Sequence, residues 1–335
     1  MTTAEKLRLL QQISGLTQQR LAEKIGVTFV ALNRWMNGKA HPRPAAEKKI
    51  DTLLAGYTGE RVAPESARDA RKMIITEKQN QRRRVLKTIL QHPDIFDQFA
   101  LSLTYHSCRI EGSTLTEQET AAVLFDNVAL PRKSLAEQLG AKNHQTAFEY
   151  LLHHLGEGGA LNEPFILRLH AMLMNGIRDD AGLYRRHGVR IVGSNVPAAN
   201  YLKMPELMRE LVKDIGKKTH EPIARAAQIH ARFEQIHPFA DGNGRVGRLL
   251  MNAMLVRNDI APAVIREQDR RAYYRSLQQA QLKQVYEPLE EFISDAILAG
   301  YRILERRSQF VLSLPPISNL YYAAISPASS PPFSD

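Results

Sequence analysis

The sequence predicts a mainly α-helical protein with one short β-hairpin, and two kinds of pattern support this fold class. Apolar residues recur at spacings of three and four over most of the chain, as at Ala226, Ile229 and Phe233 within residues 221–236. Strand-forming residues flanked by turn residues stand together only at 188–198. Further helical patterns cover residues 94–111, 116–125, 134–154, 164–175, 204–216 and 288–307. We therefore expect an all-helical core with a single hairpin.

The first 55 residues predict a small helical domain. One helix at 17–27 has an apolar face, and a second helix begins near Thr28 and buries Leu32. This outline resembles the phage-repressor type of helix-turn-helix domain, which implies duplex DNA as a partner, with Gln18 at the groove edge. Paired half-sites would then imply a homodimer, while a small bundle that binds protein is the alternative. The candidate DNA contacts are Gln18, Thr28, Phe29, Asn33 and Arg34.

Proline and glycine residues mark the domain boundaries. Residues 56–65 are predicted to form a linker, and residues 66–305 a larger helical domain. The tail at 306–335 is rich in proline and serine from residue 315, so we expect it to be loosely docked. The chain is thus expected to carry two domains with separate tasks.

Residues 237–248 read His-Pro-Phe-Ala-Asp-Gly-Asn-Gly-Arg-Val-Gly-Arg and lie between two helical patterns. Unpaired N–H groups at the start of the second helix attract anions. The two glycines of the turn let the backbone approach a phosphate closely, and the asparagine between them can donate from its amide. The two arginines are three apart on one helix face and match phosphate oxygens with their forked donors. The predicted nucleotide-binding residues are Gly242, Asn243, Gly244, Arg245 and Arg248.

Two further side chains in this turn suit catalysis. His237, with an ordinary pKa of about 6.5, can accept a proton from an attacking hydroxyl near neutral pH. Asp241 stands directly before the phosphate site, where a carboxylate would repel phosphates unless a hard cation such as Mg²⁺ lay between them. We therefore interpret His237 as the general base and Asp241 as the metal ligand.

The same twelve residues fit every position of the signature HPFxDGNGRxxR, and on this ground the sequence resembles the Fic family. Fic proteins transfer the AMP moiety of ATP to a hydroxyl side chain of a target protein. The resemblance implies that His237 is the base on the target Ser, Thr or Tyr and that Asp241 holds Mg²⁺ against the α- and β-phosphates. It also implies that residues 242–244 form an anion hole and that Arg245 and Arg248 hold the β- and γ-phosphates.

A second motif lies upstream, at residues 107–112. Ser107 and Glu111 are four apart and share a helix face, and Gly112 can end that helix. The motif resembles the inhibitory motif (S/T)xxxE(G/N) of the Fic family, which implies an inhibitory helix over about 94–112. Glu111 would then pair with Arg248 and misplace the triphosphate, because a carboxylate and a phosphate compete for one guanidinium. A surface pair ended by glycine is the alternative.

Two regions are expected to bind the other reaction partners. The hairpin predicted at 188–198 resembles the Fic flap, whose edge pairs with the target backbone, although it can also be an ordinary surface hairpin. Tyr273 and Tyr274 lie where the family usually builds its adenine pocket, although aromatic residues at this spacing also occur in cores. The residues expected to form the flap edge are Ile191, Val192 and Gly193.

The composition agrees with two functions in one globular chain. Apolar residues make up 44% and charged residues 24%, which is ordinary, but the net charge of +10 favours polyanionic partners such as nucleic acid or nucleotides. Cys108 is the only cysteine, so no intrachain disulfide can form. No apolar run suits a signal sequence or a membrane span. We therefore expect a cytoplasmic protein without membrane association.

The combined prediction is an autoinhibited, Mg²⁺-dependent transfer of AMP from ATP to a target protein or to the protein itself, joined to DNA binding. Two alternatives stay open. The larger domain can serve as a nucleotide sensor that alters DNA binding in a transcriptional regulator. It can also act as a phosphodiesterase that removes AMP from a modified protein, with Glu111 aligning a water molecule.

Overall fold

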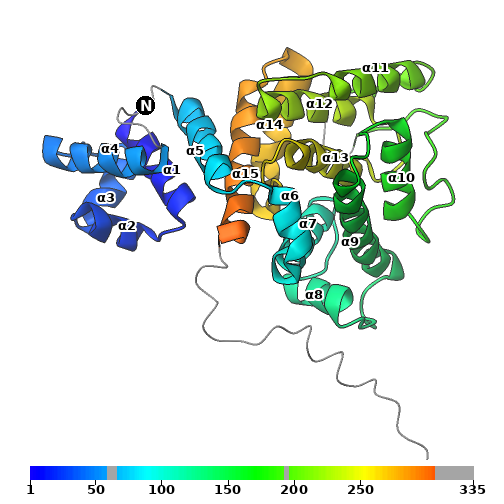
Figure 1. The fold of residues 1–335 in the computed structure, drawn as a ribbon, viewed down its shortest axis with the longest axis horizontal. Coiled ribbons are helices and arrows are strands. Elements are labelled where there is room, and N and C mark those ends of the chain that lie inside the picture. The colour runs from blue at the N-terminus through cyan, green and yellow to red at the C-terminus, as the bar shows by residue number, and fades with distance from the viewer. Residues whose placement is uncertain (59–65, 192–195, 306–335) are drawn as a thin grey trace, which may run out of the picture.

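The computed structural model of the chain describes residues 1–58, 66–191 and 196–305, and every regular element within these ranges is a helix (Figure 1). The N-terminal domain is a compact four-helix unit. Its helices are α1 (Thr3–Ser14), α2 (Gln18–Ile25), α3 (Phe29–Met36) and α4 (Pro44–Thr58). The prediction of a mainly α-helical fold is confirmed.

The larger domain follows with α5 (Ala67–Gln81), α6 (Val85–Gln91), α7 (Pro93–Ile110), α8 (Glu117–Phe125), α9 (Leu135–Gly156) and α10 (Glu163–Leu173). It continues with α11 (Met204–Gly216), α12 (Pro222–Ile236), α13 (Asn243–Arg257), the short 3₁₀ helix η1 (Glu267–Asp269), α14 (Arg270–Lys283) and α15 (Glu287–Glu305).

The helix boundaries of the N-terminal domain follow from its sequence. Thr17 and Thr28 cap α2 and α3, because each side-chain oxygen accepts a hydrogen bond from an N–H group that has no partner within its helix. Gly26 ends α2 in the left-handed conformation, which glycine adopts without strain. These caps fix a helix, a tight turn and a second helix over residues 17–36.

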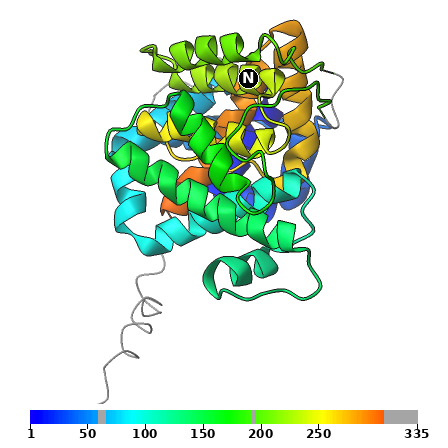
Figure 2. The ribbon, with the colours of Figure 1, turned by 90° about the vertical axis from the view of Figure 1, so that its right-hand side faces the viewer.

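Helix α13 is the centre of the larger domain. Nearly every residue from Val246 to Val256 is buried, so this helix is enclosed on all sides rather than on one face. It packs against α12, α10, α9 and α7, which surround it in both views (Figures 1 and 2). Because α13 begins in the turn at 237–248, the core of the domain fixes the position of that turn.

The two domains contact each other. Helix α1 lies against α5 and α15, and α4 lies against α5 (Figure 1). The Arg302 guanidinium of α15 also donates a hydrogen bond to the Gln12 carbonyl of α1. The N-terminal domain therefore has a defined place on the larger one.

The structure does not support the hairpin predicted at 188–198. Residues 188–191 and 196–198 form no strand, and Val192 and Gly193 lie outside the described residues. A hairpin requires its two flanks to bond to each other. Here the carbonyls of His187 and Ala199 both accept from Arg185, and Ala199 N–H donates to Gln235, so these flanks bond elsewhere.

The N-terminal domain ends later than expected. Helix α4 continues to Thr58, past the boundary expected at residue 55.

Within the described ranges, we find no helix with the length and apolar character needed to cross a bilayer.

Candidate active site

The turn between α12 and α13 contains the predicted catalytic histidine. His237 ends α12 in the left-handed conformation, with φ 53° and ψ 61°. Its Nδ1–H donates to the Glu234 carbonyl at 3.1 Å, which leaves Nε2 as the proton acceptor. Burial lowers the pKa of His237 below its ordinary value, so the imidazole is neutral at pH 7. The geometry therefore provides a base with a fixed tautomer.

Asn243 holds this turn closed from within. Its amide donates to the Phe239 carbonyl at 2.8 Å, and its side-chain oxygen accepts from Phe239 N–H at 2.9 Å. The Asn243 side chain is 1% exposed. One donor of this amide is therefore used inside the turn, and its donation to a phosphate stays a prediction.

The N-terminus of α13 has the backbone geometry expected of an anion site. The first N–H groups of a helix have no acceptor within the helix and carry its positive dipole end. Gly242 stands before them with φ 79°, and a Cβ there would lie 2.9 Å from Met174 Sδ. Two glycines are thus required here, since a Cβ on Gly244 would overlap the Glu111 carboxylate.

Arg248 is bound by the predicted inhibitory helix. Its Nε donates to Ser107 Oγ at 2.9 Å, and its Nη2 donates to the Ser107 carbonyl at 3.1 Å and to Glu111 Oε1 at 2.7 Å. Arg248 is 5% exposed, and the Glu111 side chain is 33% exposed. Gly112 ends the turn with φ 103°. The structure thus brings together Ser107, Glu111 and Arg248 as the motif predicts.

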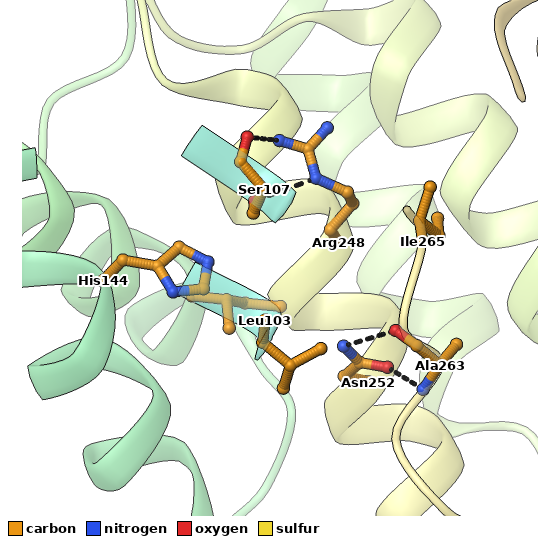
Figure 3. Close-up of a pocket in the computed structure, with 8 residues that line it drawn as sticks. Leu103, Ser107, His144, Arg248, Asn252, Ala263 and Ile265 are labelled. Carbon is orange, nitrogen blue, oxygen red and sulfur yellow. Dashed lines mark hydrogen bonds between the residues drawn. The ribbon is translucent and has the colours of Figure 1, made fainter. Parts of the chain in front are cut away.

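A small cavity lies on the inner side of this arginine (Figure 3). It is lined by Ser107, Arg248 and His144 and is the size of one water molecule, about 10 Å³. His144 shares a hydrogen bond of 3.0 Å with Thr104 Oγ1, and burial lowers its pKa to about 3. The neutral imidazole keeps a second positive charge away from Arg248.

Asp241 and Arg245 have unused bonding capacity. The Asp241 side chain is 56% exposed and lies 3.6 Å from Arg245 Nη2, while the buried Arg245 Nε has no acceptor within the described ranges. No group of three or more His, Cys, Asp or Glu side chains forms a metal site in the described part of the chain. One available carboxylate suits a Mg²⁺ ion that arrives with phosphates, which supply its other ligands.

His170 fixes the carbonyl of the predicted metal ligand, and sequence reasoning missed it. Its Nε2–H donates to the Asp241 carbonyl at 3.1 Å, its Nδ1 accepts from Gly182 N–H at 2.8 Å, and its ring stacks on Phe239 with centroids 3.7 Å apart. Burial lowers its pKa to about 4. The signal in the sequence that could have indicated a buried, hydrogen-bonded role for His170 is its place on the apolar face of α10.

A larger cavity of about 380 Å³ lies beside the turn, between residue Ile191, α12 and α14. Tyr274 lines it, whereas Tyr273 does not, because Tyr273 is 1% exposed and its hydroxyl bonds to His230 at 2.7 Å. The adenine pocket stays a prediction. Glu234, which sequence reasoning also missed, contributes a buried carboxyl. Burial raises the pKa of Glu234 to about 8, so this carboxyl is protonated at neutral pH.

The predicted DNA contacts lie on α2 and α3. Gln18 and Asn33 contact each other through a hydrogen bond of 3.2 Å, and Arg34 is exposed. Phe29 is 47% exposed. Its neighbour Val30, which was not among the predicted contacts, is 65% exposed. The Thr28 side chain caps α3, so its oxygen is already in use. Exposed apolar side chains thus lie at the start of α3, and the exposed Arg34 lies in its last turn.

Comparison with known proteins identifies both domains. The sequence model of the Fic/DOC family matches residues 160–255, and a helix-turn-helix model matches residues 7–54. The chain contains a Fic domain. It follows an N-terminal helix-turn-helix domain, and the Fic match covers α10, α12 and most of α13.

Curated relatives of the Fic domain carry an enzyme name. The chain is 33% identical over 195 residues to a protein named protein adenylyltransferase Fic from Drosophila erecta, a match that covers 57% of this chain and 39% of that protein. A protein of the same name from Nematostella vectensis is 35% identical over 180 residues, covering 52% and 42%. The chain therefore spans about two fifths of the length of these relatives.

Solved structures share the fold. A Fic domain-containing signaling protein from Bacteroides thetaiotaomicron superposes with a TM-score of 0.61 at 24% identity, covering 71% of this chain and 98% of that one. Fic-1 from C. elegans superposes with a TM-score of 0.57 at 21% identity, covering 91% and 98%. At this identity the likeness concerns the fold alone.

Proposed function

We propose that the protein transfers AMP from ATP to a Ser, Thr or Tyr hydroxyl of a target protein or of itself. The observation that carries the proposal is the turn at 237–248, which brings together a neutral imidazole, an exposed carboxylate beside Arg245 and the N-terminus of α13. The names of the curated relatives agree with this chemistry.

The chain's own residues account for each part of the reaction. The target hydroxyl oxygen forms a bond to the α-phosphorus, the bond from that phosphorus to the β-phosphate oxygen breaks, and pyrophosphate leaves. His237 Nε2 takes the hydroxyl proton. The N–H groups of α13, with Arg245 and Arg248, hold the phosphates in line, so positioning and charge neutralisation supply most of the rate. Asp241 is the residue that would hold Mg²⁺, which would neutralise phosphate charge.

Glu111 restrains this reaction in our proposal. Its carboxylate occupies the Arg248 donor that a γ-phosphate needs and lies against Gly244 at the helix N-terminus. A bound triphosphate would have to displace it or adopt another position. The ground state of the protein is therefore the restrained one.

The N-terminal domain is proposed to bind duplex DNA as a homodimer. The exposed Phe29 and Val30 at the start of α3, with Arg34 in its last turn, suit thymine methyl groups and phosphates in the major groove. The contact of α1 with α15 keeps the sensor hypothesis open, since it connects the domain that would bind DNA to the domain that would bind the nucleotide. We propose the cytoplasm as its location, where ATP, the proposed co-substrate, is available.

Labelling with ATP carrying ³²P at the α- or γ-position tests the transfer. The Glu111→Gly variant should transfer α-label, and not γ-label, to itself or to a lysate protein, and the same variant with His237→Ala should transfer neither. Label from the γ-position would indicate a kinase. Absence of α-label together with ATP-dependent DNA binding would favour the sensor, and AMP release from a modified target that needs Glu111 would favour the phosphodiesterase.

A further inference from the structure

Arg185 is a buried arginine that the proposed reaction does not use directly. It lies in the segment between α10 and α11 and is 4% exposed. Its Nε donates to the His237 carbonyl at 2.7 Å, and its Nη1 donates to the His187 carbonyl at 2.7 Å. Its Nη2 donates to the carbonyls of Ala199 at 2.6 Å and Ile236 at 3.3 Å. One guanidinium thus bonds to four backbone carbonyls.

The charge of Arg185 has no carboxylate partner in the described part of the chain. Burial alone lowers its pKa, with no contribution from a neighbouring acid. A buried cation without a counter-ion is unfavourable unless its donors are satisfied. The planar fork satisfies them with carbonyls in several directions, which the compact ammonium of lysine cannot reproduce. The requirement at this position is therefore for geometry as well as charge.

The four carbonyls belong to three segments that Arg185 joins. His187 and Ala199 lie on the two flanks of residues 188–198, and residues 236–237 form the end of α12. Two backbone bonds reinforce the junction: Arg185 N–H donates to Pro238 at 3.0 Å, and Ala199 N–H donates to Gln235 at 3.1 Å. The distance between both flanks and His237 is set through this junction.

His237 depends on such support because of its backbone. A non-glycine residue in the left-handed region is strained and persists only when its surroundings hold it. Arg185 bonds to the carbonyl of this residue and of the residue before it. The imidazole direction therefore follows from the junction as well as from α12.

We infer that Arg185 is a positioning residue that fixes the catalytic imidazole of His237 relative to the neighbouring residues His187 and Ala199. The inference rests on the proposed AMP transfer. Removing the guanidinium should lower kcat, because a displacement of about 1 Å at a reacting group can cost about 100-fold in rate. ATP affinity should stay unchanged, because the phosphate site belongs to α13 and the inhibitory helix.

The test uses the full-length chain with Glu111→Gly as the active parent. Arg185→Ala should lower kcat about 100-fold while the Kd for ATP stays the same. Arg185→Lys should remain impaired, since it retains charge without the fork. Guanidinium at about 50 mM, far below the molar concentrations that unfold proteins, should restore part of kcat to Arg185→Ala, and methylammonium should not.

Arg257→Ala is the matched control. Arg257 also donates to a backbone carbonyl, that of Ile215 at 2.9 Å, but it lies at the far end of α13. This variant should keep the parental kcat and show no response to guanidinium. Thermal unfolding of each variant verifies that kcat is compared among folded proteins.

Several outcomes would overturn the inference. An unchanged kcat in Arg185→Ala, an equal loss of kcat and ATP affinity, or equal rescue by methylammonium would each do so. A silent parent would refute the proposed transfer instead, and the NMR titration of the His237 ring then decides about Arg185. In both Arg185→Ala and Arg185→Lys the midpoint should move up toward 6.5 as the turn opens. A rise in Arg185→Ala alone would be explained by the lost charge and would contradict the positioning role.

Discussion

Replacing Glu111 with glycine should release the restraint on transfer. The substitution removes the carboxylate that accepts from Arg248 Nη2 at 2.7 Å and clears the space over Gly244. It leaves the two bonds from Arg248 to Ser107 in place. The γ-phosphate would then compete with no side chain for this donor.

The size of the effect follows from one charge-assisted hydrogen bond. Such a bond contributes about 1.5–3 kcal/mol, which corresponds to roughly 10- to 150-fold in the population of correctly placed triphosphate. Water screens the Glu111 side chain, which is one third exposed, so the expected increase is in the lower half of this range, about 10- to 50-fold.

The assay is the initial rate of α-label transfer at saturating ATP. The rate should rise by this factor, whereas the melting temperature without nucleotide should fall, because Arg248 loses a partner for its buried charge. Glu157→Gly is the control, since Glu157 is exposed at the end of α9 and far from this pair. Its rate should match that of the unmodified chain.

The reasoning would be refuted by a variant that transfers no faster than the unmodified chain while binding ATP normally. It would also be refuted by equal rate increases in Glu111→Gly and Glu157→Gly, since the increase would then owe nothing to Arg248. A rate that rises while the melting temperature also rises would contradict the view that the carboxylate stabilises the buried arginine.

Three further predictions concern separate parts of the chain. Because burial lowers the pKa of His237, the acid limb of kcat/KM for the active variant should lie below pH 6.5, and a limb at or above 6.5 would contradict this. Gly242→Ala should reduce ATP binding and destabilise the fold by about 1–2 kcal/mol, since φ is 79° and Met174 is close; calorimetry and melting measure this, with Gly216→Ala as an open-space control that should not be destabilising. Arg34→Ala should weaken duplex binding and reduce the slope of log affinity against log salt concentration by about 1, without changing transfer. An unchanged gel shift would remove the case for a DNA contact.

The sequence predicted those parts of the site that depend on local spacing. Ser107 and Glu111, four apart, share a helix face, while the pairing of Glu111 with Arg248 was implied by the resemblance to the inhibitory motif. Gly242 needs positive φ where the turn enters a helix. These features follow from helix periodicity and from the chemistry of single residues, both of which are visible in a chain without coordinates.

The sequence did not show which partners several of the side chains around the site bond to. Tyr273 and Tyr274 are adjacent on α14 and point about 100° apart, so only one can face the cavity, and spacing alone does not indicate which one. Asn243 is used by the Phe239 backbone, and Arg185 bonds to carbonyls of distant segments. Backbone acceptors have no sequence signature, so neither contact was predictable from the residue pattern.

The enclosure of α13 has a consequence for how control of this protein can change. A helix packed on every side cannot shift without disturbing the whole domain, so the groups at its N-terminus keep their positions. The turn at 111–114 lies at the domain surface, where its residues bond to the side chains of Arg248, Arg109, Glu137 and Lys133. In the proposed mechanism, substitutions in this turn can change how strongly Glu111 restrains transfer without moving the groups that carry out the reaction.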